Sequence, residues 1–203
     1  MYIGDRPVEP FIIPVPDDIS PTDYPLLSAA VRTPTGEEIG PLFAEYGVDE
    51  DDTPAVIVDA LDTDLDDAGL YAVVVTASTA SLERRRLPRL LFPVEDDSSG
   101  WHTTDSAREE WPTEGTYTDV QLYRLLAAAK TQCVDYAPTL AEGEPVPMNW
   151  ADAQLMQARN IANAAKTDPG SSADGELFVI RPYSMDKFVK NLLRPPKAVP
   201  VIG

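Results

Sequence analysis

Two acidic loops are the first place where this chain could do chemistry, because carboxylates at alternate positions can bind calcium. The run Asp62-Thr-Asp-Leu-Asp-Asp67 begins as a calcium-binding loop does. The pattern then fails, since its sixth position is Asp67 rather than glycine and its twelfth is Val73 rather than glutamate. A weak calcium site shared with Asp49–Asp52 stays open as an alternative, but a solvated acidic loop is the favoured interpretation.

The residue types that most often carry out catalysis are scarce. The chain has one histidine, His102, and one cysteine, Cys133. A single histidine cannot form a two-histidine metal site, and His102 is interpreted as a linker residue beside Trp101. Cys133 lies on an apolar helical stripe and is predicted to be a buried thiol. Because no G-x-S-x-G motif, phosphate-binding glycine loop or Cys-His pair is found, we expect no catalytic residues, no metal and no cofactor.

Charge is distributed unevenly along the chain. Residues 1–110 hold 24 Asp and Glu against 7 Arg and no Lys, whereas residues 111–203 hold 10 acids against 9 bases. The last stretch, residues 181–203, holds five basic residues and a single acidic residue, Asp186. The acidity of the first half disfavours free nucleic acid or an anionic membrane as its partner. The sequence has neither a signal-peptide pattern nor an apolar run near the roughly 18 residues of a membrane span, so we expect a soluble protein made in the cytoplasm.

Residues 1–95 are predicted to form an immunoglobulin-like β-sandwich. Pro, Gly and Asp turns, roughly 10 to 15 residues apart, separate short β-rich segments. The motif Asp67-Ala-Gly-Leu-Tyr71 has the D-x-G-x-Y form of such domains, in which the tyrosine hydroxyl bonds backbone at a corner between sheets. Val73 stands where a disulfide cysteine would be, so Tyr71 is expected in a disulfide-free core. The predicted strands are Glu9–Val15, Leu26–Arg32, Ala55–Leu61, Leu70–Thr76 and Leu87–Val94.

Helical periodicity follows an acidic linker, which we place at residues 96–110 with a possible short helix over Thr103–Glu110. Residues 111–193 are predicted to form a small α-helical bundle. Its three expected helices begin at capping residues and run from Thr118 to about Tyr136, from Asn149 to about Thr167, and from Ser184 to about Leu193. Their apolar stripes assign four residues to the core: Leu122, Leu126, Leu155 and Phe188.

Two segments of the second half are predicted to lack regular structure. Residues 168–176 are rich in Gly, Ser and Asp and are expected to form an exposed loop. Arg194-Pro-Pro196 ends any helix, so residues 194–203 are expected to leave as an extended, basic arm. The predicted fold class is therefore α+β and multidomain, with a β-sandwich, a linker, a helical bundle and an extended C-terminal arm.

Several ordered motifs from Trp101 onward resemble those of one protein family. They are Trp101-His-Thr-Thr-Asp-Ser-Ala-Arg, Glu109-Glu-Trp-Pro, Val134-Asp-Tyr-Ala-Pro138, Met156-Gln-Ala-Arg-Asn160, the 168–175 loop, Tyr183-Ser-Met-Asp186, Leu193-Arg-Pro195 and Ala198-Val-Pro-Val201. This half of the chain resembles the head-to-tail adaptor proteins of tailed phages that infect actinobacteria. The acidic first half resembles the N-terminal extension that some of these adaptors carry. None of the motifs is a catalytic signature.

The resemblance implies a structural protein of the virion neck, assembled in the host cytoplasm, rather than an enzyme. Such adaptors form a ring, with twelve subunits as the expected number, that docks on the portal protein and contacts the next neck or stopper protein. DNA would pass through the ring without specific binding, and no membrane is involved. The arm would bind the portal through Arg194, Lys197, Val199, Val201 and Ile202. The loop facing the ring neighbour or the channel would present Asp168, Ser171, Asp174 and Glu176.

Three alternatives stay open. Within the neck, the chain could be a stopper or tail-completion subunit one ring further from the head. The β-sandwich and the aspartate clusters would also suit a calcium-dependent adhesion or carbohydrate-binding module. An acidic enzyme would need paired carboxylates, and no spacing in the sequence nominates such a pair.

Overall fold

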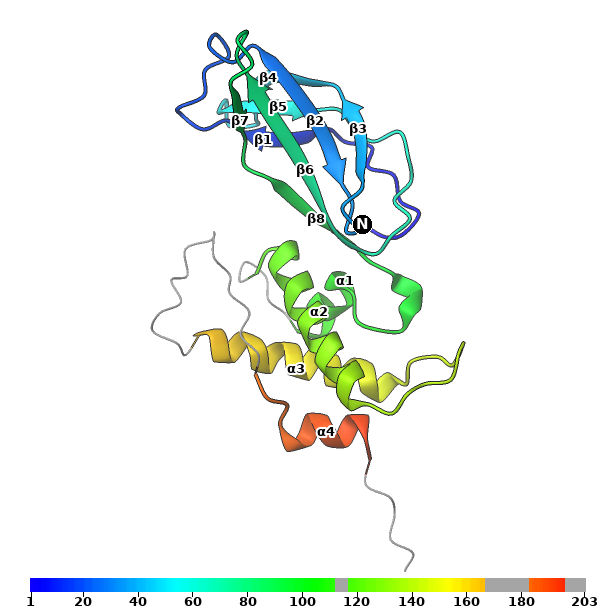
Figure 1. Cartoon of the computed structure of the whole chain (residues 1–203). Helices are drawn as coiled ribbons and strands as arrows, with labels where there is room; N and C mark the ends of the chain where they lie inside the picture. The colour runs from blue at the N-terminus through cyan, green and yellow to red at the C-terminus, as the bar shows by residue number, and fades with distance from the viewer. Residues whose placement is uncertain (112–116, 167–182, 196–203) are drawn as a thin grey trace, which may run out of the picture. The chain divides into compact units, whose positions relative to one another are not determined.

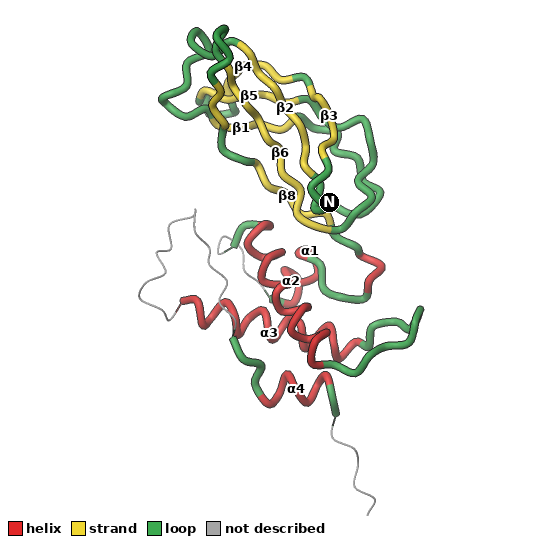
Figure 2. Tube along the Cα trace, viewed as in Figure 1, coloured by secondary structure: helices red, strands yellow, loops and turns green. Residues whose placement is uncertain are grey.

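A computed structural model of the chain describes residues 1–111, 117–166 and 183–195, and the chain divides into two compact units, Met1–Asp96 and Asp97–Gly203. The described part of the first unit holds eight strands, and that of the second holds four α-helices (Figure 1). Figure 2 shows the same division by secondary structure, with strands in yellow and helices in red. The predicted α+β class is therefore confirmed.

The first unit consists of two antiparallel sheets. The smaller sheet has the order β1 (Phe11–Pro14), β5 (Pro54–Val58), β4 (Ala44–Val48). The larger sheet begins with β3 (Glu38–Leu42), β2 (Leu26–Arg32) and β6 (Gly69–Ser78), and the free edge of β6 pairs with β7 (Arg84–Arg86) and β8 (Leu90–Val94). An isolated parallel bridge joins Tyr2 to Glu95, directly after β8.

The sheets share one hydrophobic core, which the alternation of β6 organises. Every second residue of β6 is buried from Gly69 to Ala77, as the period of a strand requires. These side chains meet buried residues of β1 and β5, including Ile13 and Val56. Core residue Tyr71 is 1% exposed, and its hydroxyl accepts a hydrogen bond from the backbone N–H of Asp67 at 3.4 Å.

The glycine of the D-x-G-x-Y motif is required by close packing. Gly69 has a φ of +155°, and a Cβ atom there would lie 2.3 Å from Cγ of Pro34. The motif thus combines a backbone donor (Asp67), a position without room for a side chain (Gly69) and a buried acceptor (Tyr71).

Three strands of the structure were not predicted: β3, β4 and β7. Their side chains are mostly exposed or half-buried, and Arg84–Arg86 is exposed throughout. Their sequences therefore lack the apolar alternation by which a strand is recognised. They form because β2, β5 and β6 offer hydrogen-bonding edges.

The second unit contains α1 (Thr104–Glu110), α2 (Asp119–Tyr136), α3 (Met148–Lys166) and α4 (Lys187–Leu193). The predicted capping box at Thr118 and Gln121 is confirmed, and Thr103 with Ser106 forms another before α1. Residues 97–110, which the sequence analysis treats as a linker, belong to this unit, and Ala107 of α1 is fully buried against α2 and α3. In the described part of the chain, no helix is both long and apolar enough to cross a membrane.

Two predicted helix starts are wrong, and one core assignment changes with them. Helix α3 begins at Met148, so Asn149 lies inside it and its side-chain amide instead donates to the carbonyl of Leu192. Helix α4 is capped by Asp186, not Ser184, since the Asp186 carboxylate accepts from the Val189 N–H at 2.8 Å.

The buried face of α4 is then formed by Val189 and Leu193, at 0% and 1% exposure. Phe188 lies beside that face and is 58% exposed, so its assignment to the core is wrong. The other three helical residues assigned to the core lie inside, with exposures of 3% or less: Leu122, Leu126 and Leu155. Cys133 is fully buried, and this burial raises the pKa of its thiol to about 12.

Candidate functional site: the groove beside α4

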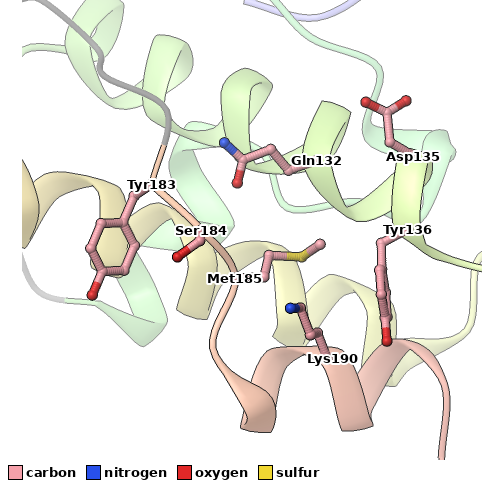
Figure 3. Close-up of a pocket in the computed structure, with 7 residues that line it drawn as sticks. All are labelled: Gln132, Asp135, Tyr136, Tyr183, Ser184, Met185 and Lys190. Carbon is pink, nitrogen blue, oxygen red and sulfur yellow. The ribbon is translucent and has the colours of Figure 1, made fainter.

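A groove of about 590 Å³ lies within the second unit, between the last turns of α2 and the segment that enters α4 (Figure 3). One wall is α2 and the other is the chain from residue 183 into α4. Its lining combines aromatic rings and a thioether with opposite charges at Asp135 and Lys190. The lining residues are Gln132, Asp135, Tyr136, Tyr183, Ser184, Met185 and Lys190.

Side-chain amides of α3 hold the two walls together. Gln157 is 0% exposed, and its Nε2 donates to Oε1 of Gln132 at 2.7 Å and to the carbonyl of Tyr183 at 2.9 Å. One turn later, Nδ2 of Asn160 donates to the Asp186 carboxylate at 3.1 Å. The segment before α4 is therefore attached to α3 at both of its ends. Sequence analysis found no role for Gln157 and Asn160, although both lie in the Met156–Asn160 motif.

The last turn of α4 is fixed around the ring of Tyr136. The guanidinium of Arg194 lies 5.0 Å from the ring centroid, and Nζ of Lys190 lies 5.8 Å from it. The Arg194 side chain also donates to the carbonyl of Ala137 at 3.5 Å. The contacts with Tyr136 and Ala137 therefore hold Arg194 in place close to the end of the described chain. We call the cluster of Tyr136, Lys190 and Arg194 side chains the arm root.

The surface beside the groove is both apolar and basic. Phe188 and Tyr183 are 58% and 44% exposed, and Lys187 is exposed as well. The groove lining offers a hydroxyl group at Ser184 but neither histidine nor cysteine to activate it. The groove therefore offers aromatic rings, a thioether and charged groups for contacts with another molecule.

Most of the residues that the resemblance assigns to binding lie outside the described residues. This applies to four residues of the arm and to four of the loop: Lys197, Val199, Val201, Ile202, Asp168, Ser171, Asp174 and Glu176. Of the portal-binding set, the structure describes Arg194 alone. Its position at the arm root is a tertiary property, because Tyr136 and Ala137 are more than fifty residues away in sequence.

Aspartates of the two acidic loops of the first unit make local contacts. The Asp49 carboxylate accepts from the N–H groups of Asp51 and Thr53, both at 2.9 Å, and so caps its own turn. Asp64 pairs with Arg6 at 2.9 Å. Within the described ranges, neither loop brings three metal-ligating side chains together.

Comparison with known proteins gives no relative for this chain: no family model, curated protein or solved structure matches it.

Proposed function

We propose that this protein is a structural head-to-tail adaptor of a phage neck, which forms a ring on the portal and extends the DNA channel toward the tail. The observation that carries the proposal is the convergence of the adaptor-like motifs. Residues from four separate motifs meet around the groove and the arm root. They are Asp135–Ala137, Gln157 with Asn160, Tyr183–Asp186, and Arg194.

This convergence supports a binding role for the C-terminal segment. A short helix such as α4 is marginal alone, so the amide contacts from α3 and the contacts of Tyr136 serve to hold it. An arm that leaves from a fixed root loses less conformational freedom on docking than one that leaves from a mobile helix. The arm would add main-chain hydrogen bonds to a sheet edge of the portal, with Val199 and Val201 as alternate apolar contacts.

We further infer that the first unit is an immunoglobulin-like sandwich and the second a helical bundle. The order β1-β5-β4 matches strands B, E and D of that fold, and β3-β2-β6-β8 matches C′, C, F and G. The hydrogen bond from Asp67 to Tyr71 then falls at the corner before strand F, where such a tyrosine is expected. This unit would decorate or brace the neck.

The proposal is tested by mixing the full chain with the portal protein of the same phage and imaging the mixture by negative stain, with native mass measurement. We expect a ring of this protein on the portal. A variant that lacks residues 197–203 should remain folded, since α4 and the arm root precede the deletion, but should no longer bind.

A matched pair of point variants separates the arm root from general charge. Arg194→Gln should weaken portal binding, whereas Arg89→Gln removes one exposed positive charge from the first unit and should not. Normal portal attachment by the deletion variant would refute the arm assignment. Binding only to a portal that already carries another ring would instead identify a stopper subunit and overturn the adaptor proposal.

A further inference from the structure

Three side chains of the second unit converge as a set of metal ligands. His102 precedes α1, Glu110 is the last residue of α1, and Asp152 is the fifth residue of α3. One ligand atom from each lies within 4.8 Å of the other two, and Nε2 of His102 is 4.0 Å from Oε2 of Glu110. Among the described residues, this is the one group of three or more such side chains that comes together.

The His102 ring is held with one nitrogen facing this cluster. Its side chain is 8% exposed, and Nδ1 lies 3.1 Å from Oγ of Ser106, one helical turn along the same face. Nδ1 and the Ser106 hydroxyl share one hydrogen bond, and its direction depends on the imidazole tautomer. In the tautomer that binds a metal, Nδ1–H donates to Ser106 and the lone pair lies on Nε2, as in metal-binding histidines whose other nitrogen donates to a fixed partner.

The Nε2 atom itself is buried and has no hydrogen-bond partner among the described residues. Unpaired buried polar atoms are uncommon in native proteins because each one loses its hydrogen bonds to water. Something should therefore occupy the space between this nitrogen and the two carboxylates.

The backbone around His102 is also fixed. Its N–H donates to Oε1 of Gln154 at 2.9 Å, and Gln154 is 1% exposed and donates to the carbonyl of Leu126 at 3.1 Å. Trp101 packs on Trp150 with ring centroids 6.4 Å apart, two residues before Asp152. His102 and Asp152 are thus brought together by buried contacts on both sides of the cluster.

The nearby cations are engaged elsewhere. Arg108 pairs with Asp119 at 2.7 Å, while Arg159 lies 5.5 Å from the centroid of the Trp111 ring and donates to the main-chain carbonyl of Glu110. The side-chain carboxylates of Glu110 and Asp152 come within 4.8 Å of each other and of the His102 imidazole. Two neighbouring carboxylates repel, and a divalent cation removes that repulsion.

We propose that His102, Glu110 and Asp152 bind a divalent cation of the zinc class, with water completing its coordination. One imidazole nitrogen with two carboxylate oxygens suits zinc, cobalt or manganese better than calcium or magnesium, which prefer oxygen ligands alone. Since the ligands come from both ends of α1 and from the start of α3, the ion would clamp α1 onto α3 and stabilise the second unit.

The test is zinc titration of the purified full chain by calorimetry at neutral pH, after treatment with a chelator. We expect saturable binding of one ion per chain and a higher thermal midpoint in zinc than in chelator. Glu110→Gln and Asp152→Asn should each weaken zinc binding by about tenfold or more and remove the thermal shift. Both changes are at exposed positions, so far-UV circular dichroism should show an unchanged fold.

The matched control is Glu109→Gln, which removes an exposed carboxylate from the same helix outside the cluster and should bind zinc as the parent does. Cobalt gives a second measurement, because its visible absorption reports coordination and should be lost in His102→Gln. Binding that is equal in all variants would indicate adventitious surface sites and overturn the proposal. So would the absence of saturable binding below millimolar zinc.

Discussion

Replacing Gln157 by methionine tests whether the buried amide of α3 holds α4 and the arm root in place. The Gln157 side chain is fully buried and donates to Gln132 and to the Tyr183 carbonyl at 2.7 and 2.9 Å. Methionine has a similar length and an unbranched shape, so the change removes both hydrogen bonds without opening a large cavity.

The expected magnitude follows from these contacts. Each hydrogen bond contributes about 1 kcal/mol net, so losing both costs about 2 kcal/mol locally. Oε1 of Gln157 is itself buried without a partner among the described residues, and its removal returns about 1 kcal/mol. We therefore expect the free energy of unfolding to fall by about 1 kcal/mol, and the local opening of residues 183–193 to become about five times more frequent.

Hydrogen exchange followed by mass spectrometry measures that local opening. The matched control is Gln154→Met, because Gln154 is also buried but bonds His102 and Leu126 rather than the segment before α4. Gln154→Met should lose at least as much global stability in urea as Gln157→Met, because both atoms of the Gln154 amide are hydrogen-bonded. Only Gln157→Met should exchange faster over residues 183–193. Equal exchange of this segment in the two variants would show that the amide of Gln157 does not hold α4.

Two further predictions concern the core of the second unit. Val189→Ala should lower the free energy of unfolding by about 2 kcal/mol, since Val189 is fully buried, whereas Phe188→Ala at an exposed position should change it by less than about 0.5 kcal/mol. Urea titration measures both, and a larger effect at Phe188 would contradict the register of α4. The raised pKa of Cys133, about 12, means that the folded thiol stays protonated while the unfolded thiol ionises near its ordinary pKa of 9.0. Its contribution to stability should therefore be lost as pH rises from 9.0 toward 12, and a thiol reagent at pH 8 should react only on unfolding. Rapid labelling of the native protein would show that the thiol is accessible.

Local patterns predicted the elements that carry their own signal. Strand β2 was predicted with its bounds, and the strongly alternating β6 was predicted in most of its length, because their side chains alternate between core and surface. The capping box at Thr118 and Gln121 could also be predicted, since the residues that satisfy the first turn of α2 lie three positions apart.

Elements without such a pattern could not be predicted from the sequence, because they form through contacts in the tertiary structure. Strand β7 is the run Arg84–Arg86, with no apolar side chain, and it exists because β6 extends beyond β8 and offers an unpaired edge. The start of α4 was misplaced by two residues because Ser184 and Asp186 are both good caps. The contact of Asn160 with Asp186 favours the second.

The sequence by itself determined the local chemistry of this protein: alternating strands, capped helices and a basic C-terminal stretch. Only the tertiary structure decided which residues act together. The single histidine was interpreted as a linker residue, yet folding brings Asp152 of α3 beside His102 and Glu110. In the same way, Gln157 and Tyr136 acquire their roles only when α2, α3 and α4 pack. The physical reason is that local propensity depends on neighbours in sequence, whereas the groove and the ligand cluster depend on buried contacts between residues tens of positions apart.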